Sequence, residues 1–308
     1  MTWFEDRIEA GERLILDGAI GTELQRRGLA MDDDAWCARA NLDDPDTVRA
    51  LHSDYIDAGA DIITANTFST HRYVLEPAGL AGRFETINRR AVALAREARD
   101  DAGGRAIAIA GSMSHMPALT FRHERPDAAK AAATYRELAD ILADAGCELL
   151  IAEMMMSPGH AEAVVEAAAR TGLPVWVGFS VRVADDDRVM MLYDDSEVES
   201  SPNGRIPLAD FAPGVLARGG TVAGIMHSDV EETEPGLNAL EAVWDGPLLA
   251  YPHSGDWSPP NWGFDTVIDP QAYARAAAGW VEQHNVQVVG GCCGIGPDHI
   301  RALRERLG

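Results

Sequence analysis

Two adjacent cysteines, Cys292 and Cys293, stand between glycines in the segment VVGGCCGIG, residues 288–296. Successive side chains of a strand point to opposite faces, so neighbouring cysteines can share one metal ion only where a strand has ended. The flanking glycines permit such a turn because glycine accepts backbone angles that other residues avoid. Paired thiolates favour soft or borderline metals, with Zn²⁺ as the usual choice. The alternative is a pair of small buried residues at a tight turn.

A third metal ligand is expected from another strand end. A catalytic zinc takes three protein ligands and keeps one position open for water or substrate. His227, in the segment GIMHSD, is the best candidate, because two cysteines and one histidine form an established catalytic ligand set. His115 and His253 are weaker candidates for the metal. For these two histidines, a substrate contact or a histidine satisfied by internal hydrogen bonds is the simpler interpretation.

The elements that must position these residues alternate regularly along the chain. Apolar runs rich in Val, Ile and Leu recur about eight times, and each is followed by a turn and a helical stretch. The runs are 13–21, 60–68, 105–113, 148–156, 174–181, 221–228, 247–255 and 286–294. This alternation predicts an α/β fold, a single (βα)8 TIM barrel domain over residues 1–308, with its active site at the C-terminal ends of the strands.

Polar side chains stand at the C-terminal ends of these runs, which meet around one mouth in a parallel barrel. They are Asp17, Asn66, His115, Glu153, Ser180, His227, His253 and Asp256, besides the cysteine pair. Among them we predict that Asn66, Ser180, His253 and Asp256 bind substrate. Two longer segments, 112–127 and 180–207, are predicted to lie over the same mouth. The TELQ segment after the first run predicts a capping box between Thr22 and Gln25.

Composition excludes several classes of function. The 308 residues carry a formal net charge of −23, which argues against nucleic acid and an anionic membrane surface as partners but tolerates a cationic substrate. No run of about 18 apolar residues indicates a membrane span. The N-terminal segment lacks the pattern of a signal peptide, and the 4 cysteines do not form a disulfide framework. We therefore expect a cytoplasmic protein, and a homo-oligomer is compatible with this composition.

Several segments in order along the chain carry a family resemblance. They are LDGAIGTELQRRG (16–28), ANTF (65–68), LLIAEMMMSP (149–158), GFS (178–180), GIMHS (224–228), YPHSGD (251–256) and GGCCG (290–294). With them the chain resembles the homocysteine S-methyltransferase family, the zinc-dependent thiol methyltransferases that include the betaine–homocysteine and S-methylmethionine–homocysteine enzymes. The resemblance covers nearly the whole chain.

The resemblance implies a metal-dependent transfer of a methyl group to homocysteine or a similar small thiol. The cationic donor would be S-methylmethionine, betaine, a dimethylsulfonium compound or S-adenosylmethionine. Asp17 and Glu153 would be the catalytic-site carboxylates that bind the amino group of the thiol. A turn cap for Asp17 and a structural ion pair for Glu153 are the alternatives. Aromatic residues of the segment 253–264 stand beside Asp256 and suit an onium cation.

The metal ligands depart from the family pattern. Family members hold zinc through three cysteines, whereas here His227 stands where the first cysteine is expected. Two thiolates and a neutral imidazole balance the charge of Zn²⁺, so a bound thiol should be more acidic and its sulfur a weaker nucleophile. Three alternatives therefore stay open: a metal-dependent lyase or hydrolase, a non-catalytic metal- or thiol-binding homologue, and methyl exchange with a separate corrinoid protein.

Overall fold

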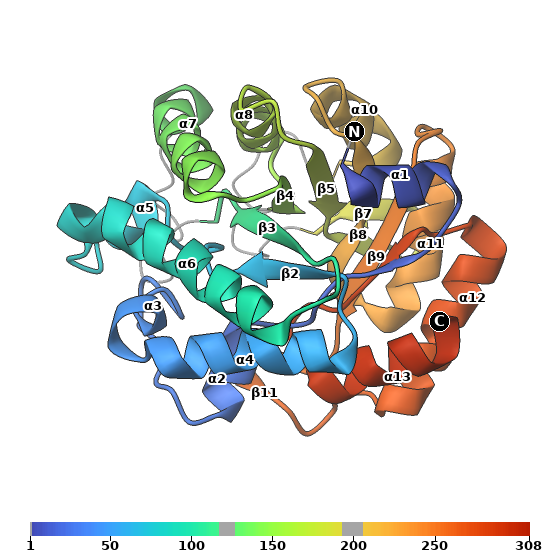
Figure 1. Ribbon diagram of the computed structural model, residues 1–308. Helices are drawn as coiled ribbons and strands as arrows, with labels where there is room; N and C mark the ends of the chain where they lie inside the picture. Colours follow the sequence, from blue (N-terminus) through green and yellow to red (C-terminus); the bar gives the residue numbers. More distant parts are fainter. Residues whose placement is uncertain (1, 117–126, 193–205) are drawn as a thin grey trace.

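The computed structural model, which describes residues 2–116, 127–192 and 206–308, has a barrel of parallel strands at its centre. Within these residues eight strands form one sheet in the order β1-β12-β9-β8-β5-β4-β3-β2. A parallel bridge between Leu16 and Ile62 joins β1 to β2 and closes the circle. Figure 1 shows the helices arranged around these strands. The predicted TIM barrel is confirmed, and each of its strands lies inside one of the eight apolar runs, except that β8 extends one residue beyond its run, to Asp229.

The barrel strands are short. They are β1 (Leu14–Ile15), β2 (Ile62–Ala65), β3 (Ala108–Met113), β4 (Leu149–Met155), β5 (Val175–Phe179), β8 (Val222–Asp229), β9 (Leu248–His253) and β12 (Val288–Val289). Two antiparallel hairpins lie outside the barrel: β6 (Val181–Val183) with β7 (Val189–Met191), and β10 (Asp256–Ser258) with β11 (Asn261–Gly263). The first hairpin lies in the predicted long segment 180–207. The rest of that segment from 193 to 205, and most of 112–127, fall outside the described residues.

Helices follow the strands as the alternation predicts. They are α1 (Trp3–Glu9), α2 (Gly21–Arg26), α3 (Ala40–Asp43), α4 (Pro45–Ala58), α5 (Arg72–Leu75), the 3-10 turn η1 (Ala81–Arg83), α6 (Phe84–Ala102), α7 (Ala128–Ala145), α8 (Pro158–Ala169), α10 (Leu208–Leu216), α11 (Val230–Glu241), α12 (Pro270–His284) and α13 (Pro297–Leu307). None of the helices in the described part of the chain is both long and apolar enough to cross a membrane.

The core has two layers. One apolar cluster fills the space between the strands and the surrounding helices, and a second fills the inside of the barrel. Phe4 of α1 belongs to the inner cluster, and its ring meets Trp176 of β5 edge to face at 6.1 Å. Helix α1 therefore covers one end of the barrel, so that the opposite end is left for chemistry. That the whole chain forms a single domain stays a prediction.

A charged network supports the barrel at the N-terminal ends of its strands. The buried carboxylate of Asp61 accepts the backbone N–H of Ile15 at 2.9 Å. It also pairs with Arg304 at 2.5 Å, with Arg105 at 3.2 Å and with Arg7 at 3.5 Å. These contacts join α1, β1, β2 and α13. Side chains at this end of a TIM barrel generally serve stability, because the active site lies at the other end.

Candidate metal centre and active site

His227 lies where strand β8 is interrupted by a bulge. The pairing of β8 with β9 shifts register between Met226 and Asp229, and His227 takes a left-handed backbone conformation with φ of 43°. A β-bulge re-aims side chains, and a left-handed backbone costs a non-glycine residue about 1–3 kcal/mol. The surrounding sheet must hold this conformation in place. Its effect is to turn the imidazole toward the cysteine pair.

The cysteine loop after β12 is fixed by its backbone. Cys292 N–H donates to the Pro252 carbonyl at 2.8 Å, and the Cys293 carbonyl accepts from Ser254 N–H at 3.0 Å. Gly294 has a φ of 82°, and a Cβ there would lie 1.9 Å from the Ser254 carbonyl oxygen. Only glycine fits this position, for both reasons. The loop is thus joined to the end of β9 through four residues of backbone.

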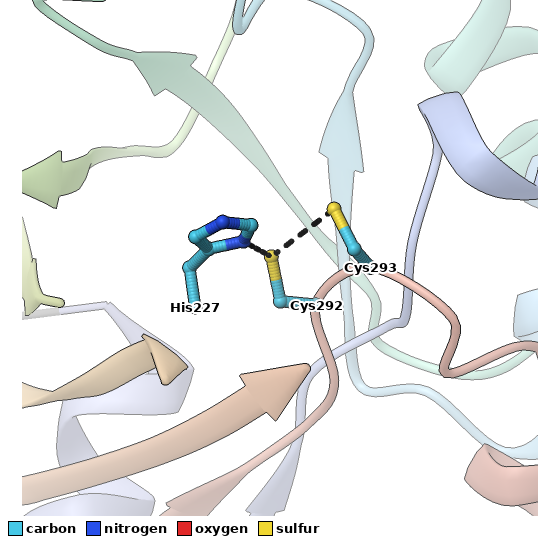
Figure 2. A group of neighbouring side chains, drawn as sticks. All are labelled: His227, Cys292 and Cys293. Carbon is cyan, nitrogen blue, oxygen red and sulfur yellow. Dashed lines mark hydrogen bonds between the residues drawn. The ribbon is translucent and has the colours of Figure 1, made fainter. Parts of the chain in front are cut away.

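The three predicted ligands come together as the only such group found in the described residues (Figure 2). Cys292 Sγ lies 3.5 Å from His227 Nδ1 and 3.9 Å from Cys293 Sγ, and all three ligand atoms lie within 4.8 Å of one another. Tetrahedral Zn²⁺ places two sulfur ligands about 3.8 Å apart, and a sulfur and a nitrogen about 3.5 Å apart. These two distances therefore match the edges of a zinc tetrahedron, and the donor set fits the metal.

Burial keeps the imidazole of His227 and the thiol of Cys293 uncharged when no cation is bound. It lowers the pKa of His227 well below its usual value, and the nearby His253 lowers it further, so the imidazole is neutral and able to bind a metal. The pKa of Cys293 is raised well above its usual value, first by its hydrogen bond with Cys292 and then by burial. Two thiolates can form side by side here only when a positive charge is bound between them.

Two carboxylates, the buried Asp17 and the partly buried Glu153, lie at the same mouth of the barrel. Asp17, at the end of β1, accepts hydrogen bonds from Thr64 N at 2.7 Å and Thr64 Oγ1 at 2.8 Å. Glu153, beside the bulge in β4, accepts a short hydrogen bond from Ser112. Burial raises the pKa of each to about 7, and the charge of Glu153 adds to the rise at Asp17. Such a pair favours a bound cation that would let both carboxylates ionise.

His253 packs directly against His227. Their ring centroids are 4.5 Å apart, and Trp262 of β11 contacts both rings, at 5.3 Å from His253 and 6.0 Å from His227. His253 Nε2 lies 3.0 Å from the carboxylate of Asp229, which fixes the ring. His253 is not one of the three grouped ligands. Its predicted role in binding substrate stays a prediction.

The other predicted substrate-binding residues differ in their surroundings. The amide of Asn66 is buried and fully engaged with Cys37 and Asn41. Ser180 is buried and donates to the Met226 sulfur at 3.4 Å. Asp256 lies exposed on the β10–β11 hairpin and accepts from Thr266 at 2.7 Å. Their roles toward substrate stay predictions, and the internal contacts of Asn66 are those of a structural residue.

The histidine His115 is used for structure. Its Nε2 accepts backbone N–H groups from Met156 at 3.1 Å and Ser157 at 3.4 Å. It thereby anchors the chain just after the bulge of β4, where Met154 has a positive φ of 54°. His115 lies outside the three grouped ligands, as expected of a histidine satisfied by hydrogen bonds.

The predicted capping box in TELQ is wrong. Helix α2 is capped by Ile20 without a side-chain hydrogen bond. Thr22 instead accepts the N–H of Gly294 in the cysteine loop at 3.0 Å. The amide of Gln25 bonds both the N–H and the carbonyl of Trp262, at 2.8 and 3.0 Å. Local spacing could not indicate these partners, because they lie more than 230 residues away along the chain. Helix α2 is therefore a support for the site.

Comparison with known proteins identifies the family of the chain. The family described as homocysteine S-methyltransferase matches residues 14–307. The chain is similar to a selenocysteine methyltransferase from Astragalus bisulcatus, with 28% identity over 97% of this chain and 94% of that protein. It is also similar to a homocysteine S-methyltransferase from Escherichia coli strain K12, with 29% identity over 97% of this chain and 96% of that protein.

Solved structures are similar over the whole barrel. The metallated form of the homocysteine methyltransferase MmuM from Escherichia coli superimposes with a TM-score of 0.79 at 24% identity, covering 98% of this chain and 99% of that chain. At that identity the match supports the fold alone. The grouped ligands and the two carboxylates rest on the contacts within this chain and not on this likeness.

Proposed function

We propose that this chain, which belongs to the homocysteine S-methyltransferase family, moves a methyl group from a cationic onium donor to the sulfur of homocysteine or a similar amino-acid thiol. Family membership makes the chain a thiol methyltransferase. The metal, the donor and the acceptor are the proposed parts. The observation that carries them is the group His227, Cys292 and Cys293, which lies at the same barrel mouth as the carboxylates of Asp17 and Glu153.

The proposed metal is zinc, held by His227 Nδ1 and by the sulfurs of Cys292 and Cys293. A bound Zn²⁺ would supply the positive charge that keeps an acceptor thiol ionised at neutral pH. Asp17 and Glu153 accept hydrogen bonds from the ammonium group of the acceptor and so orient its sulfur. Because the thiol would lose its proton to solvent on binding the metal, none of the side chains has to act as a general base in the methyl transfer.

The donor is proposed to lie on the hairpin side of the mouth. Trp257 of β10 is a large exposed aromatic residue, and its ring lies 6.2 Å from Trp262 and 6.3 Å from Trp36. Aromatic faces attract onium cations, and Asp256 adds a negative charge. Methyl transfer forms one S–C bond and breaks the donor's S–C or N–C bond, whose electron pair leaves on a neutral thioether or amine. Opposite charges cancel in this step, so rings that exclude water favour it.

Two cysteines that must stay reduced to bind the metal suit a reducing compartment, and we propose the cytoplasm on that ground. We propose no nucleic acid partner, because the net charge of −23 repels phosphates. The small thiol and the cationic donor are the proposed partners.

Metal analysis tests the ligand set. Purified wild-type protein should hold about one zinc ion, and His227→Ala and Cys292→Ala should lose it. Cys147→Ala is the matched control, since Cys147 is a buried cysteine outside the grouped ligands. If His227→Ala keeps its full metal content, the proposed ligand set is incorrect.

A substrate panel tests the reaction. Homocysteine and other thiols are incubated with betaine, S-methylmethionine, dimethylsulfoniopropionate and S-adenosylmethionine, and the products are separated by mass spectrometry. One donor should give a methylated thiol. If every pair stays unreacted, the metal-dependent lyase or hydrolase, which the extra Lewis acidity of a neutral metal site favours, becomes the better assignment.

His227→Cys restores the three-cysteine set of the family and tests the charge argument. It should retain zinc, raise the pKa of the bound acceptor thiol and make the bound sulfur a better nucleophile. The pH dependence of single-turnover rates measures both effects together. A variant with an unchanged pH profile would contradict the reasoning.

A further inference from the structure

The hydroxyl of Tyr251 has no hydrogen bond of good geometry to any residue that the structure describes, although it lies near enough to Glu153 to lower the pKa of that carboxyl. Tyr251 lies on β9, two residues before His253, and its side chain belongs to the inner cluster of the barrel at 2% exposure. A buried hydroxyl without a partner costs about 1–3 kcal/mol. An unpaired group of this kind, at the edge of a proposed active site, is a place for a ligand atom to bind.

The groups around this hydroxyl are those of the proposed acceptor site. Glu153 interacts most strongly with it, and Cys292 and Asp17 also act on it electrostatically. Burial and these negative charges raise the pKa of Tyr251 well above its usual value, so the hydroxyl stays neutral. The hydroxyl is therefore close enough to Glu153, Asp17 and Cys292 to interact with all three, and the head group of an amino-acid thiol would have to fit beside these same residues.

Gly178 of β5 provides the space for the hydroxyl. A Cβ at position 178 would lie 2.3 Å from the Tyr251 oxygen and 2.5 Å from Met226 Cγ. The backbone of Gly178 is not left-handed, so an alanine meets no backbone strain there and acts only through the space it takes. Glycine at this point thus lets the tyrosine oxygen reach the site.

We propose that the Tyr251 hydroxyl is a third contact for the ammonium group of the acceptor, beside Asp17 and Glu153, and so selects thiols that carry an amino group. An ammonium group has three N–H donors, and three acceptor groups then surround it. Thr64 and Ser112 already donate hydrogen bonds to the two carboxylates. A third acceptor oxygen would therefore help to satisfy the ammonium group. The Tyr251 proton can point to Glu153 while its oxygen accepts from the substrate. This inference rests on the proposed acceptor site.

The test compares homocysteine with 4-mercaptobutanoate, which is homocysteine without its amino group. Tyr251→Phe should lower kcat/KM for homocysteine about tenfold or more, the size of a hydrogen bond to a charged group. It should change kcat/KM for 4-mercaptobutanoate by less than about twofold and leave the zinc content unchanged. Gly178→Ala, which pushes the hydroxyl aside, should give the same selective loss.

Tyr55→Phe is the matched control, because the Tyr55 hydroxyl is also buried but donates to the Ala19 carbonyl at 2.6 Å. A structural effect of this kind should lower kcat/KM by the same factor for both thiols. The proposal is overturned if Tyr251→Phe lowers kcat/KM by the same factor for both thiols, or lowers it for neither. Calorimetric binding of the two thiols to zinc-loaded protein measures the same ratio without turnover. The proposal therefore stands or falls even if no donor supports methyl transfer.

Discussion

Glu153→Gln should stabilise the metal-free protein at neutral and alkaline pH while it removes the amino-group site. Burial raises the pKa of Glu153 from 4.5 to about 7. The folded protein therefore holds this proton to a higher pH than the unfolded chain, and the free energy of unfolding falls as pH rises between about 4.5 and 7. Glutamine never ionises, and its side-chain oxygen can still accept from Ser112. The free energy of unfolding of the variant therefore does not fall for this reason over this pH range.

The magnitude follows from the same numbers. The rise from 4.5 to about 7 corresponds to about 3 kcal/mol, at about 1.4 kcal/mol for each pH unit. The variant should exceed wild type by less than about 1 kcal/mol near pH 5 and by up to about 3 kcal/mol near pH 8. A residue kept at such a cost is expected at a functional site, where stability is commonly exchanged for activity.

Urea unfolding at pH 5, 6, 7 and 8, followed by circular dichroism, measures this difference. Chelator and reductant are present throughout, so that metal binding and disulfides do not contribute. Glu282→Gln, an exposed glutamate on α12, is the control for loss of one negative charge. A stability difference that is the same at all four pH values, or a variant less stable than wild type at pH 8, would refute the reasoning.

Three further predictions follow from the site and its supports. The KM for homocysteine should rise as pH falls from 8 to 6, because Asp17 and Glu153 must be ionised to bind an ammonium group and each has a pKa raised to about 7. The KM for 4-mercaptobutanoate, measured in the same assay, should stay constant over this pH range. Gly294→Ala should lower both zinc affinity and melting temperature, since its methyl group would clash with the Ser254 carbonyl. Competition with a chromogenic chelator measures the zinc affinity, and a thermal scan measures the melting temperature. An unchanged zinc affinity would contradict this prediction. Asp61→Ala should lower the free energy of unfolding in urea by about 2 kcal/mol, because it removes the buried carboxylate that accepts the N–H of Ile15 and pairs with Arg304, yet it should keep the zinc affinity of wild type.

Much of the fold could be predicted from the sequence because its signal is repeated. Each barrel strand is a short apolar run before a helix, and one uncertain run does not change the pattern of the other seven. The cysteine pair could be found for a similar reason, since adjacent cysteines between glycines have few uses. His227 was reached through its place at a strand end and through the resemblance.

The supports of the site could not be predicted, because they depend on contacts between distant segments. Thr22 and Gln25 have the spacing of a local cap, yet their partners are Gly294 and Trp262. Tyr251 reads as a core residue inside the run 247–255. Its free hydroxyl appears only once Gly178 of another strand lies opposite. The bulge that turns His227 inward has no sequence signal either, since bulges are set by the pairing of strands.

The pairing of β1 with β12 gives metal binding a second consequence. Leu14 pairs with Val288 across a seam between the first and last strands of the barrel, and the cysteine loop continues directly from that seam. A metal ion held between this loop and β8 can bind only after the seam has closed. By mass action, bound zinc then opposes reopening of the barrel and slows unfolding without speeding the search that brings β1 and β12 together. Zinc release would thus accompany the first separation of β1 from β12, and a fluorescent zinc indicator could follow this opening of the barrel in real time.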